Sequence, residues 1–291
     1  MTASIGVALL TETPPSLLQI IAEARTGLRS SKAQGKNRTS FGPDVAALDE
    51  AQAKDALRVI CRDGDLRVIW EPLVRLSDET VMGHELLVRG PVGEFERPGE
   101  LFRAATEQGL LTLLDMRCLR ACVMAAAARP ATGDLHINLL PSTLLDVPVS
   151  TILRVLEELP TGVRACIEVN EQQFVSHPSY LLESIRALRE AGIRIAIDDV
   201  GSGRGTLDSV LVLQPDVVKI DVSLVRGASD DPARSVQLGR LARLCQSLDI
   251  EMVAEGVETA ADRDFVRALG IGTGQGYFWA GEQIGSASES R

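Results

Sequence analysis

The sequence predicts a closed α/β barrel of the (β/α)8 type with an irregular start, preceded by a short N-terminal β–α extension. From about Ala46 onward, short β-branched runs alternate with stretches of helical periodicity, as in βα units around a parallel sheet. Eight such runs fall within roughly 245 residues, a length that suits one barrel. Only Ser77–Thr80 separates the first two runs, which favours an antiparallel hairpin. A doubly wound open sheet is the alternative.

The individual elements follow this alternation along the chain. The predicted strands are Leu66–Leu76, Val81–Arg89, Leu135–Leu139, Ala165–Val169, Arg194–Ile197, Val217–Ile220, Glu251–Ala254 and Gly276–Trp279. The predicted helices are Gly99–Ala128, Thr143–Glu158, Ser179–Ala191, Thr206–Leu213, Ala233–Leu248 and Ala260–Leu269. Ser179 and Thr206 stand at expected N-caps, and Gly192 and Gly270 at expected C-caps.

Composition excludes several classes of function. The 291 residues are 45% hydrophobic and 24% charged, the balance of an ordinary globular chain. With 40 acidic and 30 basic residues, the net charge of −10 disfavours binding to a DNA or RNA polymer. No apolar run approaches the roughly 20 residues of a membrane span, and the N-terminus lacks a signal-peptide pattern. We therefore expect a cytoplasmic protein without a membrane segment.

Cysteine and histidine do not form a metal-binding pattern. The five cysteines are scattered, and Cys118 and Cys122 lie one helical turn apart in an apolar helix, which predicts buried thiols. Zinc is therefore not expected. Because side chains alternate along a strand, His84 and His136 are expected to point away from the polar residues near them, as packing or supporting groups.

Acidic and amide side chains gather where the predicted strands end. In a barrel of this type, the carboxyl ends of all strands meet at one rim, which is where chemistry is found. Each residue alone could be a solvated acid, a cap or part of a structural ion pair. Together they predict a cluster of acids that needs cations, and oxygen ligands favour Mg²⁺ or Mn²⁺ in a two-metal phosphoester hydrolase. The residues are Glu85, Arg89, Asn138, Glu168, Glu171, Asp198, Asp199, Lys219, Asp221, Glu255, Glu258 and Gln275.

Seven segments, in order, carry a family resemblance: HELLVRG, INLLPSTL, IEVNE, IAIDDVGSG, VVKID, VAEGVE and GQGY. Between roughly Ala51 and Gly281 the chain resembles the EAL family of cyclic di-GMP phosphodiesterases. The resemblance implies a modified TIM barrel with an antiparallel first strand. It also implies hydrolysis of cyclic di-GMP to linear pGpG with two divalent ions, Mg²⁺ or Mn²⁺, in bacterial signalling. A homodimer is a further expectation from the resemblance.

The resemblance also assigns roles to residues, position by position. It implies metal binding by Glu85, Asn138, Glu168, Asp198, Asp199 and Glu255. It implies catalysis by Lys219, which orients or deprotonates the attacking water, together with Glu85 and Glu255. It implies substrate binding by Arg89, Glu71, Leu87, Asp221 and Gln275. It implies that Glu171 and Glu258 hold neighbouring loops in position.

Several positions depart from the family pattern. Glu71 stands where the family usually has a ligand-contacting Gln, and its charge is expected to weaken binding of a dianionic dinucleotide. Leu86, Gly90, Leu140 and Val200 replace Ala, a large residue, Ser and Phe respectively. Two alternatives therefore stay open beside the enzyme: a cyclic di-GMP receptor or regulatory module without turnover, and an interaction scaffold that binds neither metal nor nucleotide.

Residues 1–45 do not share the strand–helix alternation of the predicted barrel at 46–291. A strand at Ser4–Leu10, a turn at Pro14-Pro15, a helix with a basic end and a boundary at Gly42-Pro43 are predicted. This part resembles the last strand and helix of a GGDEF (diguanylate cyclase) domain, without that family's signature. No cyclase activity is expected, and the chain is expected to be a fragment of a longer GGDEF–EAL protein or a truncated relative. An unrelated helical extension is the alternative.

Overall fold

The computed structural model describes residues 5–7, 24, 31, 39–41, 56–62, 64, 66–129, 131, 133–170, 178–201 and 206–279. The chain divides into two compact units, Met1–Val59 and Ile60–Arg291. In the first unit, β1 (Ile5–Val7) pairs in parallel with β2 (Thr39–Phe41). The first strand falls within the predicted Ser4–Leu10, and the second was not predicted. The expected boundary at Gly42-Pro43 lies outside the described residues.

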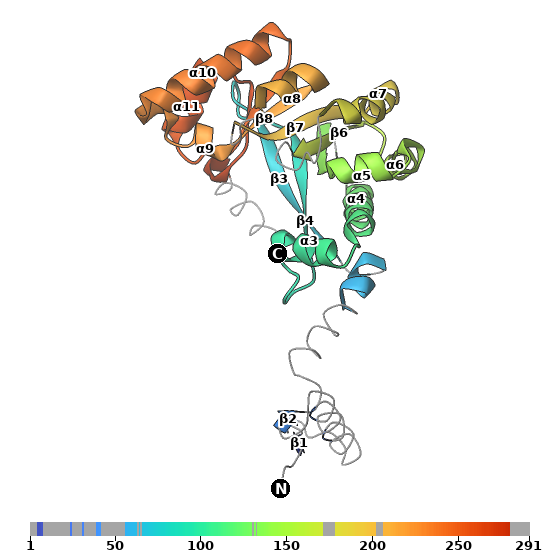
Figure 1. The fold of residues 1–291 in the computed structure, drawn as a ribbon. Coiled ribbons are helices and arrows are strands. Elements are labelled where there is room, and N and C mark those ends of the chain that lie inside the picture. Colours follow the sequence, from blue (N-terminus) through green and yellow to red (C-terminus); the bar gives the residue numbers. More distant parts are fainter. Residues whose placement is uncertain are drawn as a thin grey trace, which may run out of the picture. The chain divides into compact units, whose positions relative to one another are not determined.

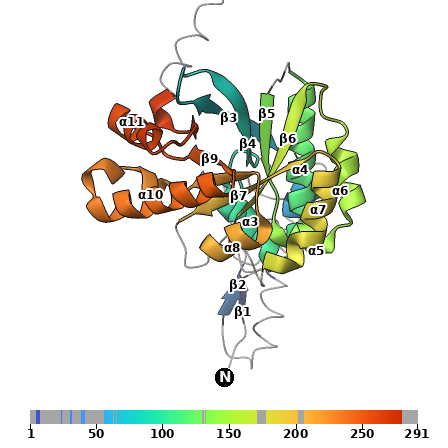
Figure 2. The same cartoon turned by 90° about the horizontal axis from the view of Figure 1, so that it is seen from above.

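The second unit is a closed barrel of eight strands (Figure 2). Its order is β10-β3-β4-β5-β6-β7-β8-β9. The antiparallel β3 pairs with β4 and with β10, and every other neighbouring pair is parallel. The predicted barrel with an antiparallel first strand is confirmed, and the open sheet is excluded. The strands are β3 (Arg67–Arg75), β4 (Val81–Arg89), β5 (Gly133–Asn138), β6 (Val163–Asn170), β7 (Arg194–Val200), β8 (Val217–Ile220), β9 (Glu251–Ala254) and β10 (Thr273–Gly274).

Helices cover the outside of this barrel, with α4 to α7 on one side and α10 and α11 on the opposite side (Figures 1 and 2). Among the described residues, no helix combines the length and apolar character needed to cross a membrane. The α-helices are α3 (Pro98–Glu107), α4 (Leu111–Ala127), α5 (Pro141–Asp146), α6 (Val149–Leu156), α7 (Leu182–Glu190), α8 (Thr206–Leu213), α9 (Val222–Val225), α10 (Pro232–Ser247) and α11 (Ala260–Ala268). Two 3₁₀ turns, η2 (Pro178–Leu181) and η3 (Ala228–Asp230), also lie among the described residues, and residues 56–62 are helical as well.

Two predicted helices are each split in the structure. The predicted Gly99–Ala128 is broken between α3 and α4 at Gly109, whose φ of +66° suits glycine and ends a helix. The predicted Thr143–Glu158 is broken between α5 and α6 at Pro148, because proline supplies no N–H to continue the ladder of hydrogen bonds.

The predicted caps are half right. Gly192 and Gly270 adopt φ of +83° and +79° after their helices, as expected for C-caps. Ser179 instead lies inside η2, and Thr206 is the first residue of α8 rather than the residue before it. Helix ends commonly differ from sequence estimates by a residue or two.

The prediction of a last strand at Gly276–Trp279 is wrong. The chain forms β10 at Thr273–Gly274, and residues 277–279 are helical. Trp279 serves packing, since it is only 5% exposed, whereas Tyr277 is 79% exposed. A Cβ on Gly274 would lie 2.7 Å from the Trp279 ring, so the short strand needs glycine where the ring covers it.

The strands divide their side chains between two cores. Outward residues such as Leu135, Ile137 and Ile197 join the large cluster shared with the helices. A smaller cluster contains residues from strands alone and fills the barrel interior: Leu73, Cys166, Ala196, Val217 and Val253. All five cysteines are buried and unpaired, as predicted for Cys118 and Cys122.

Ion pairs close the amino end of the barrel. Asp134 on β5 lies 2.6 Å from Arg164 and 3.2 Å from Arg194. Arg194 on β7 also lies 2.8 Å from Glu251 on β9. Two acids therefore meet two bases, and this end of the barrel is balanced in charge.

Candidate functional site

A polar layer lies two residues further along the strands from the apolar interior layer. Because strand side chains alternate, Cys166, Ala196, Val217 and Val253 are each followed on the same face by a charged residue. The centre of this layer is Lys219, whose side chain is 1% exposed. Its Nζ lies within 3.2 Å of four carboxylates: Glu85 at 3.0 Å, Glu168 at 2.9 Å, Asp198 at 3.2 Å and Glu255 at 2.8 Å.

The charges of this layer determine one another's ionisation. Burial alone would lower the pKa of Lys219, but the surrounding carboxylates hold it well above its usual value. Burial works against the Glu85 carboxylate, yet Lys219, Gln275 and Asn138 bring its pKa down to about 2. Burial raises the pKa of Glu168 and of Glu255, and the attraction of Lys219 only partly opposes it. One ammonium therefore does not neutralise the cluster.

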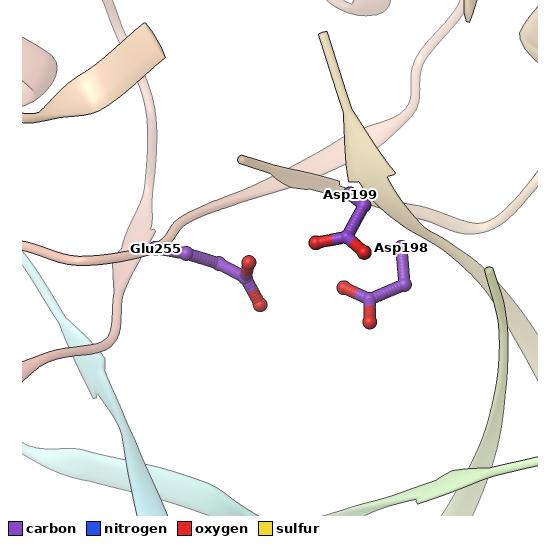
Figure 3. A group of neighbouring side chains, drawn as sticks. All are labelled: Asp198, Asp199 and Glu255. Atoms are coloured by element: carbon purple, nitrogen blue, oxygen red, sulfur yellow. The ribbon is translucent and has the colours of Figure 1, made fainter. Parts of the chain in front are cut away.

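Two consecutive aspartates enter the cluster through an irregularity in β7. The pairing of β7 with β8 shifts register between Ile197 and Val200, and Asp199 adopts φ of +58°. Such a bulge lets neighbouring residues present their side chains to the same region. Asp198, Asp199 and Glu255 each offer an oxygen within 4.8 Å of the others, with Glu255 facing the aspartates from the position just after β9 (Figure 3). Asn170 donates a hydrogen bond to Asp199.

The donor set fits a divalent cation with oxygen ligands. Asp198 Oδ1 is buried, lies 3.2 Å from Lys219 Nζ, and accepts no hydrogen bond from the described residues. Gln275 Oε1 is likewise a buried acceptor without a donor among them. Carboxylate and amide oxygens in excess over cations are the ligands preferred by Mg²⁺ and Mn²⁺. The sequence-predicted acids thus converge on a place suited to such ions.

Glu85 is held by neutral donors as well as by Lys219. Asn138 Nδ2 donates to Glu85 Oε1 at 2.9 Å, and Gln275 Nε2 donates to Oε2 at 2.7 Å. Glu71 lies directly opposite Glu85 in the antiparallel register of β3 and β4. Burial and the nearby Glu85 raise the pKa of Glu71. The structure therefore brings the predicted Glu85, Asn138 and Gln275 together and places the likewise predicted Glu71 opposite Glu85 as a further acid.

A pocket of about 370 Å³ opens beside these carboxylates. Its polar lining includes Glu85, Asn138 and Asp198, and its apolar wall includes Pro98 and Phe102 from α3. Leu87 and Arg89, which follow Glu85 on the inner face of β4, also line it. This cavity is within the size range of small-molecule sites.

The remaining predicted residues have other contacts. Asp221 is the N-cap of α9, where its side chain accepts a hydrogen bond from Ser223 N at 2.8 Å. Its negative charge still contributes to the raised pKa of Asp199. Glu258 forms an ion pair with Arg226. Glu171 lies outside the described residues.

The prediction that His136 points away from the site is wrong. Residues two apart on a strand face the same side, so His136 shares the inner face with Asn138. Its Nδ1 lies 2.7 Å from Glu168 Oε1. His84, one residue from Glu85, does point away and packs edge-on against Trp70 at a ring distance of 5.4 Å. The two-residue spacing between His136 and Asn138 on β5 would have predicted that both face the site. No such spacing pointed to the hydrogen bond between Asn170 and Asp199.

Departures from the family pattern have local explanations. A Cβ on Gly90 would lie 1.9 Å from Phe95 O, so the loop after β4 has no room for a side chain there. Leu86 and Val200 are buried in the outer core. Leu140 uses its backbone N–H to donate to Asp115 Oδ2 at 2.9 Å. Asp115 on α4 is an additional buried acid that sequence reasoning missed.

The chain is an α/β-barrel protein with a cluster of carboxylates around one buried lysine. The cluster lies toward the carboxyl ends of the strands, where barrels of this type have their active sites. Residues 53–282 match the EAL domain, and the chain belongs to the EAL domain family. The predicted family is thereby confirmed. Its boundaries include the described barrel strands.

Two curated relatives extend the comparison to nearly the whole chain. The chain is 30% identical over 300 residues to cyclic di-GMP phosphodiesterase NbdA of Pseudomonas aeruginosa, covering 96% of this chain and 37% of that protein. It is 25% identical over 291 residues to cyclic di-GMP phosphodiesterase PdeR of Escherichia coli, covering 96% of this chain and 44% of that protein. The chain therefore spans less than half the length of these relatives.

Solved structures resemble the barrel and were determined with ligands. BlrP1 of Klebsiella pneumoniae, in a calcium and cyclic di-GMP complex, is 29% identical with a TM-score of 0.66, over 73% of this chain and 54% of that chain. A manganese complex of the same protein gives a TM-score of 0.65 at 28% identity, over 75% and 56%. A standalone EAL protein of Vibrio cholerae, bound to cyclic di-GMP, is 26% identical with a TM-score of 0.63, over 74% and 91%.

Proposed function

We propose that this chain is a metal-dependent phosphodiesterase that hydrolyses cyclic di-GMP to linear pGpG. The observation that carries the proposal is the cluster of four carboxylates around Lys219, with Asp199 beside it. The similarity to NbdA and PdeR, which are named cyclic di-GMP phosphodiesterases, and the ligands of the BlrP1 complexes support the same reaction. The carboxylate and amide donors and the adjoining pocket support a phosphorylated substrate held near divalent ions.

The proposed ion-binding residues divide into two overlapping groups. Glu85, Asn138, Glu168 and Asp198 would hold one Mg²⁺ or Mn²⁺. Asp198, Asp199 and Glu255 would hold the second, since their oxygens already lie close together (Figure 3). When bound, divalent ions stabilise the negative charge that develops as a phosphodiester is cleaved.

The remaining side chains would place substrate and water. Lys219 would orient the attacking water and stabilise the hydroxide that forms from it, because its ammonium is held among the carboxylates at the base of the site. Leu87 and Arg89 line the pocket, where Arg89 would pair with a phosphate. Glu71, Asp221 and Gln275 would complete the substrate contacts. Glu171 and Glu258 would hold neighbouring loops.

The second candidate is a cyclic di-GMP receptor without turnover. It is motivated by the departures from the family pattern at Glu71, Leu86, Leu140 and Val200, of which Glu71 adds a carboxylate opposite Glu85 in the site. For the whole protein we also propose a homodimer and a GGDEF-like origin for residues 1–45. Sedimentation of the purified chain tests the dimer, since a monomer at all concentrations excludes it.

The deciding experiment follows pGpG formation with Mg²⁺ and with Mn²⁺. Wild type should form product with at least one ion, and Glu85→Ala should abolish it because a carboxylate at the centre of the cluster is lost. Glu107→Ala is the matched control, since Glu107 forms only an exposed ion pair with Arg103 on α3. Tight binding of cyclic di-GMP without product would favour the receptor. Folded protein with neither binding nor product would contradict both.

A further inference from the structure

We propose that His136 is a positioning residue that holds Glu168 in place for cation binding by donating a hydrogen bond from Nδ1 to Oε1. The inference rests on the proposed function, because it takes Glu168 as a ligand of a divalent ion. His136 itself touches neither substrate nor ion in this proposal. Its effect is to fix which way the Glu168 carboxylate faces.

The geometry leaves Glu168 little freedom. The His136 and Glu168 side chains are 3% and 0% exposed, and the two atoms are 2.7 Å apart. The other carboxylate oxygen, Oε2, accepts from Lys219 Nζ at 2.9 Å. The carboxylate is thus held at both oxygens, from β5 on one side and from β8 on the other.

The backbone register explains why this histidine reaches this glutamate. In the parallel pair of β5 and β6, Asn138 lies opposite Glu168 and His136 lies opposite Cys166. His136 therefore stands one inward layer nearer the amino end than Glu168, level with Cys166 of the apolar interior layer. From this position the imidazole ring reaches the Glu168 carboxylate from the amino-end side of the barrel.

The proposed role fixes the direction of the hydrogen bond, because His136 Nδ1 and Glu168 Oε1 are close enough to share one proton and a carboxylate that binds a cation must be ionised. A neutral imidazole has one N–H, and an ionised carboxylate can only accept. The tautomer with the proton on Nδ1 is therefore the one that satisfies Glu168 as an anionic ligand.

No other described residue replaces this donor. Within the described part of the chain, Glu168 Oε1 accepts a side-chain hydrogen bond from His136 alone. The adjacent interior layer, which includes Cys166 and Ala196, is apolar. Removing the imidazole would leave a buried carboxylate oxygen without a partner and free to turn. Losing a group that orients a metal ligand typically lowers metal affinity about 10- to 100-fold.

The test measures Mn²⁺ binding to the full chain by electron paramagnetic resonance, beside thermal unfolding in EDTA. His136→Leu keeps a similar volume but has no donor, and His136→Gln retains an N–H donor. His84→Leu is the matched control, since His84 packs against Trp70 on the other face of β4. We expect a 10- to 100-fold weaker Mn²⁺ affinity in His136→Leu, recovery to within about fivefold in His136→Gln, and no change in His84→Leu.

The outcomes separate this inference from the proposed function. Equal Mn²⁺ affinity in wild type and folded His136→Leu overturns the role of His136 alone. Wild type that binds no Mn²⁺ overturns the proposed function as well. If His136→Leu does not fold, the inference is decided by His136→Gln against His136→Asn, whose amide is too short to reach Glu168. A loss of Mn²⁺ affinity in His136→Asn but not in His136→Gln supports it, and equal affinities overturn it.

Discussion

The two ends of the barrel balance their acidic side chains in opposite ways. At the amino end, Asp134 and Glu251 are matched by Arg164 and Arg194. At the carboxyl end, Lys219 alone faces four carboxylates, with Asp199 close by. The difference teaches that the first network is complete in itself, whereas the second needs further positive charge.

The energetic consequence follows from desolvation. A buried carboxylate loses several kcal/mol of hydration free energy, by order of magnitude, unless nearby cations replace it. At the amino end, Arg164 and Arg194 supply this replacement for the buried Asp134, while Glu251 stays largely exposed to water. At the carboxyl end, the raised pKa values of Glu168 and Glu255 show that Lys219 does not supply enough. Divalent ions would supply the missing positive charge at the carboxyl end. The excess of carboxylates there would then serve to bind those ions.

The largest expected difference between the two ends is in turnover. Lys219→Met should reduce pGpG formation by at least about 100-fold at saturating Mn²⁺, because the group that orients water and the cluster is lost. Arg194→Met should leave turnover within about threefold. It should instead lower the free energy of unfolding by about 2 kcal/mol, since the mostly buried Asp134 loses one of its partners.

These two variants are each other's control. Product formation followed against time and urea unfolding in EDTA give both quantities for both proteins. A loss of turnover in Arg194→Met as large as in Lys219→Met would show that the ends are not functionally separate.

The next largest effect concerns stabilisation by ions. Mn²⁺ at about 100 times its dissociation constant should stabilise wild type by about 2.7 kcal/mol for one site. Glu85→Gln should lose most of this gain, while Arg194→Met should keep it because the amino end has no uncompensated acids. Thermal unfolding with Mn²⁺ and with EDTA checks this. If Mn²⁺ stabilised Glu85→Gln as much as wild type, the ion would bind outside the cluster around Lys219.

A third test compares two buried acids, one without and one with a cationic partner. Burial raises the pKa of Asp115 to about 6, although the Leu140 N–H and Thr143 stabilise its charge. Between about pH 4 and 6 the folded chain therefore keeps a proton that the unfolded chain releases, and stability falls as pH rises. Asp115→Asn should lack this loss, which is on the order of 2 kcal/mol.

Asp134→Asn supplies the contrast for this third test. Asp134 accepts from Arg164 and Arg194, so its replacement should destabilise the fold at pH 7. Urea unfolding of wild type and both variants at pH 4 and pH 7 gives the differences directly. If the free energy of unfolding changed by the same amount between pH 4 and pH 7 in Asp115→Asn and in wild type, Asp115 would not be the group with the raised pKa.

The sequence was sufficient for the barrel and for most of the cluster. Alternating strands and helices, with one hairpin, specified the fold, and the polar residues in or after the apolar strand runs included Glu85, Asp198 and Lys219. These features are local, because each depends on a periodicity or on the residue after an apolar run. The splits at Gly109 and Pro148 also had local signals, although each lay inside a longer helical pattern.

Features that depend on distant parts of the chain could not be predicted in this way. Asp115 lies within an apolar helical stripe. Its side chain accepts a hydrogen bond from the backbone N–H of Leu140, which is 25 residues away in the sequence. The irregularity of β7 at Asp198 and Asp199 appears only when β8 is in register beside it. Trp279 was taken for a strand residue because its packing on Gly274 is a tertiary contact.

The smallest expected effect concerns the additional acid at the carboxyl end. Glu71 lies opposite Glu85, where a further negative charge opposes a dianionic ligand. Glu71→Gln should raise the affinity for cyclic di-GMP about fivefold, since one partly screened charge contributes about 1 kcal/mol. Calorimetric titration with Ca²⁺, the ion of one Klebsiella complex, measures this change.

The matched control places the same charge change at the other end of the barrel. Glu79 lies in the hairpin before β4 and pairs with Arg263, so Glu79→Gln changes the net charge equally without approaching the cluster. If both variants raise affinity alike, the effect comes from the overall charge of −10 rather than from the site. A gain confined to Glu71→Gln would mean that the excess of acid at the carboxyl end also limits how strongly the ligand binds. That end would then carry more negative charge than cation binding requires.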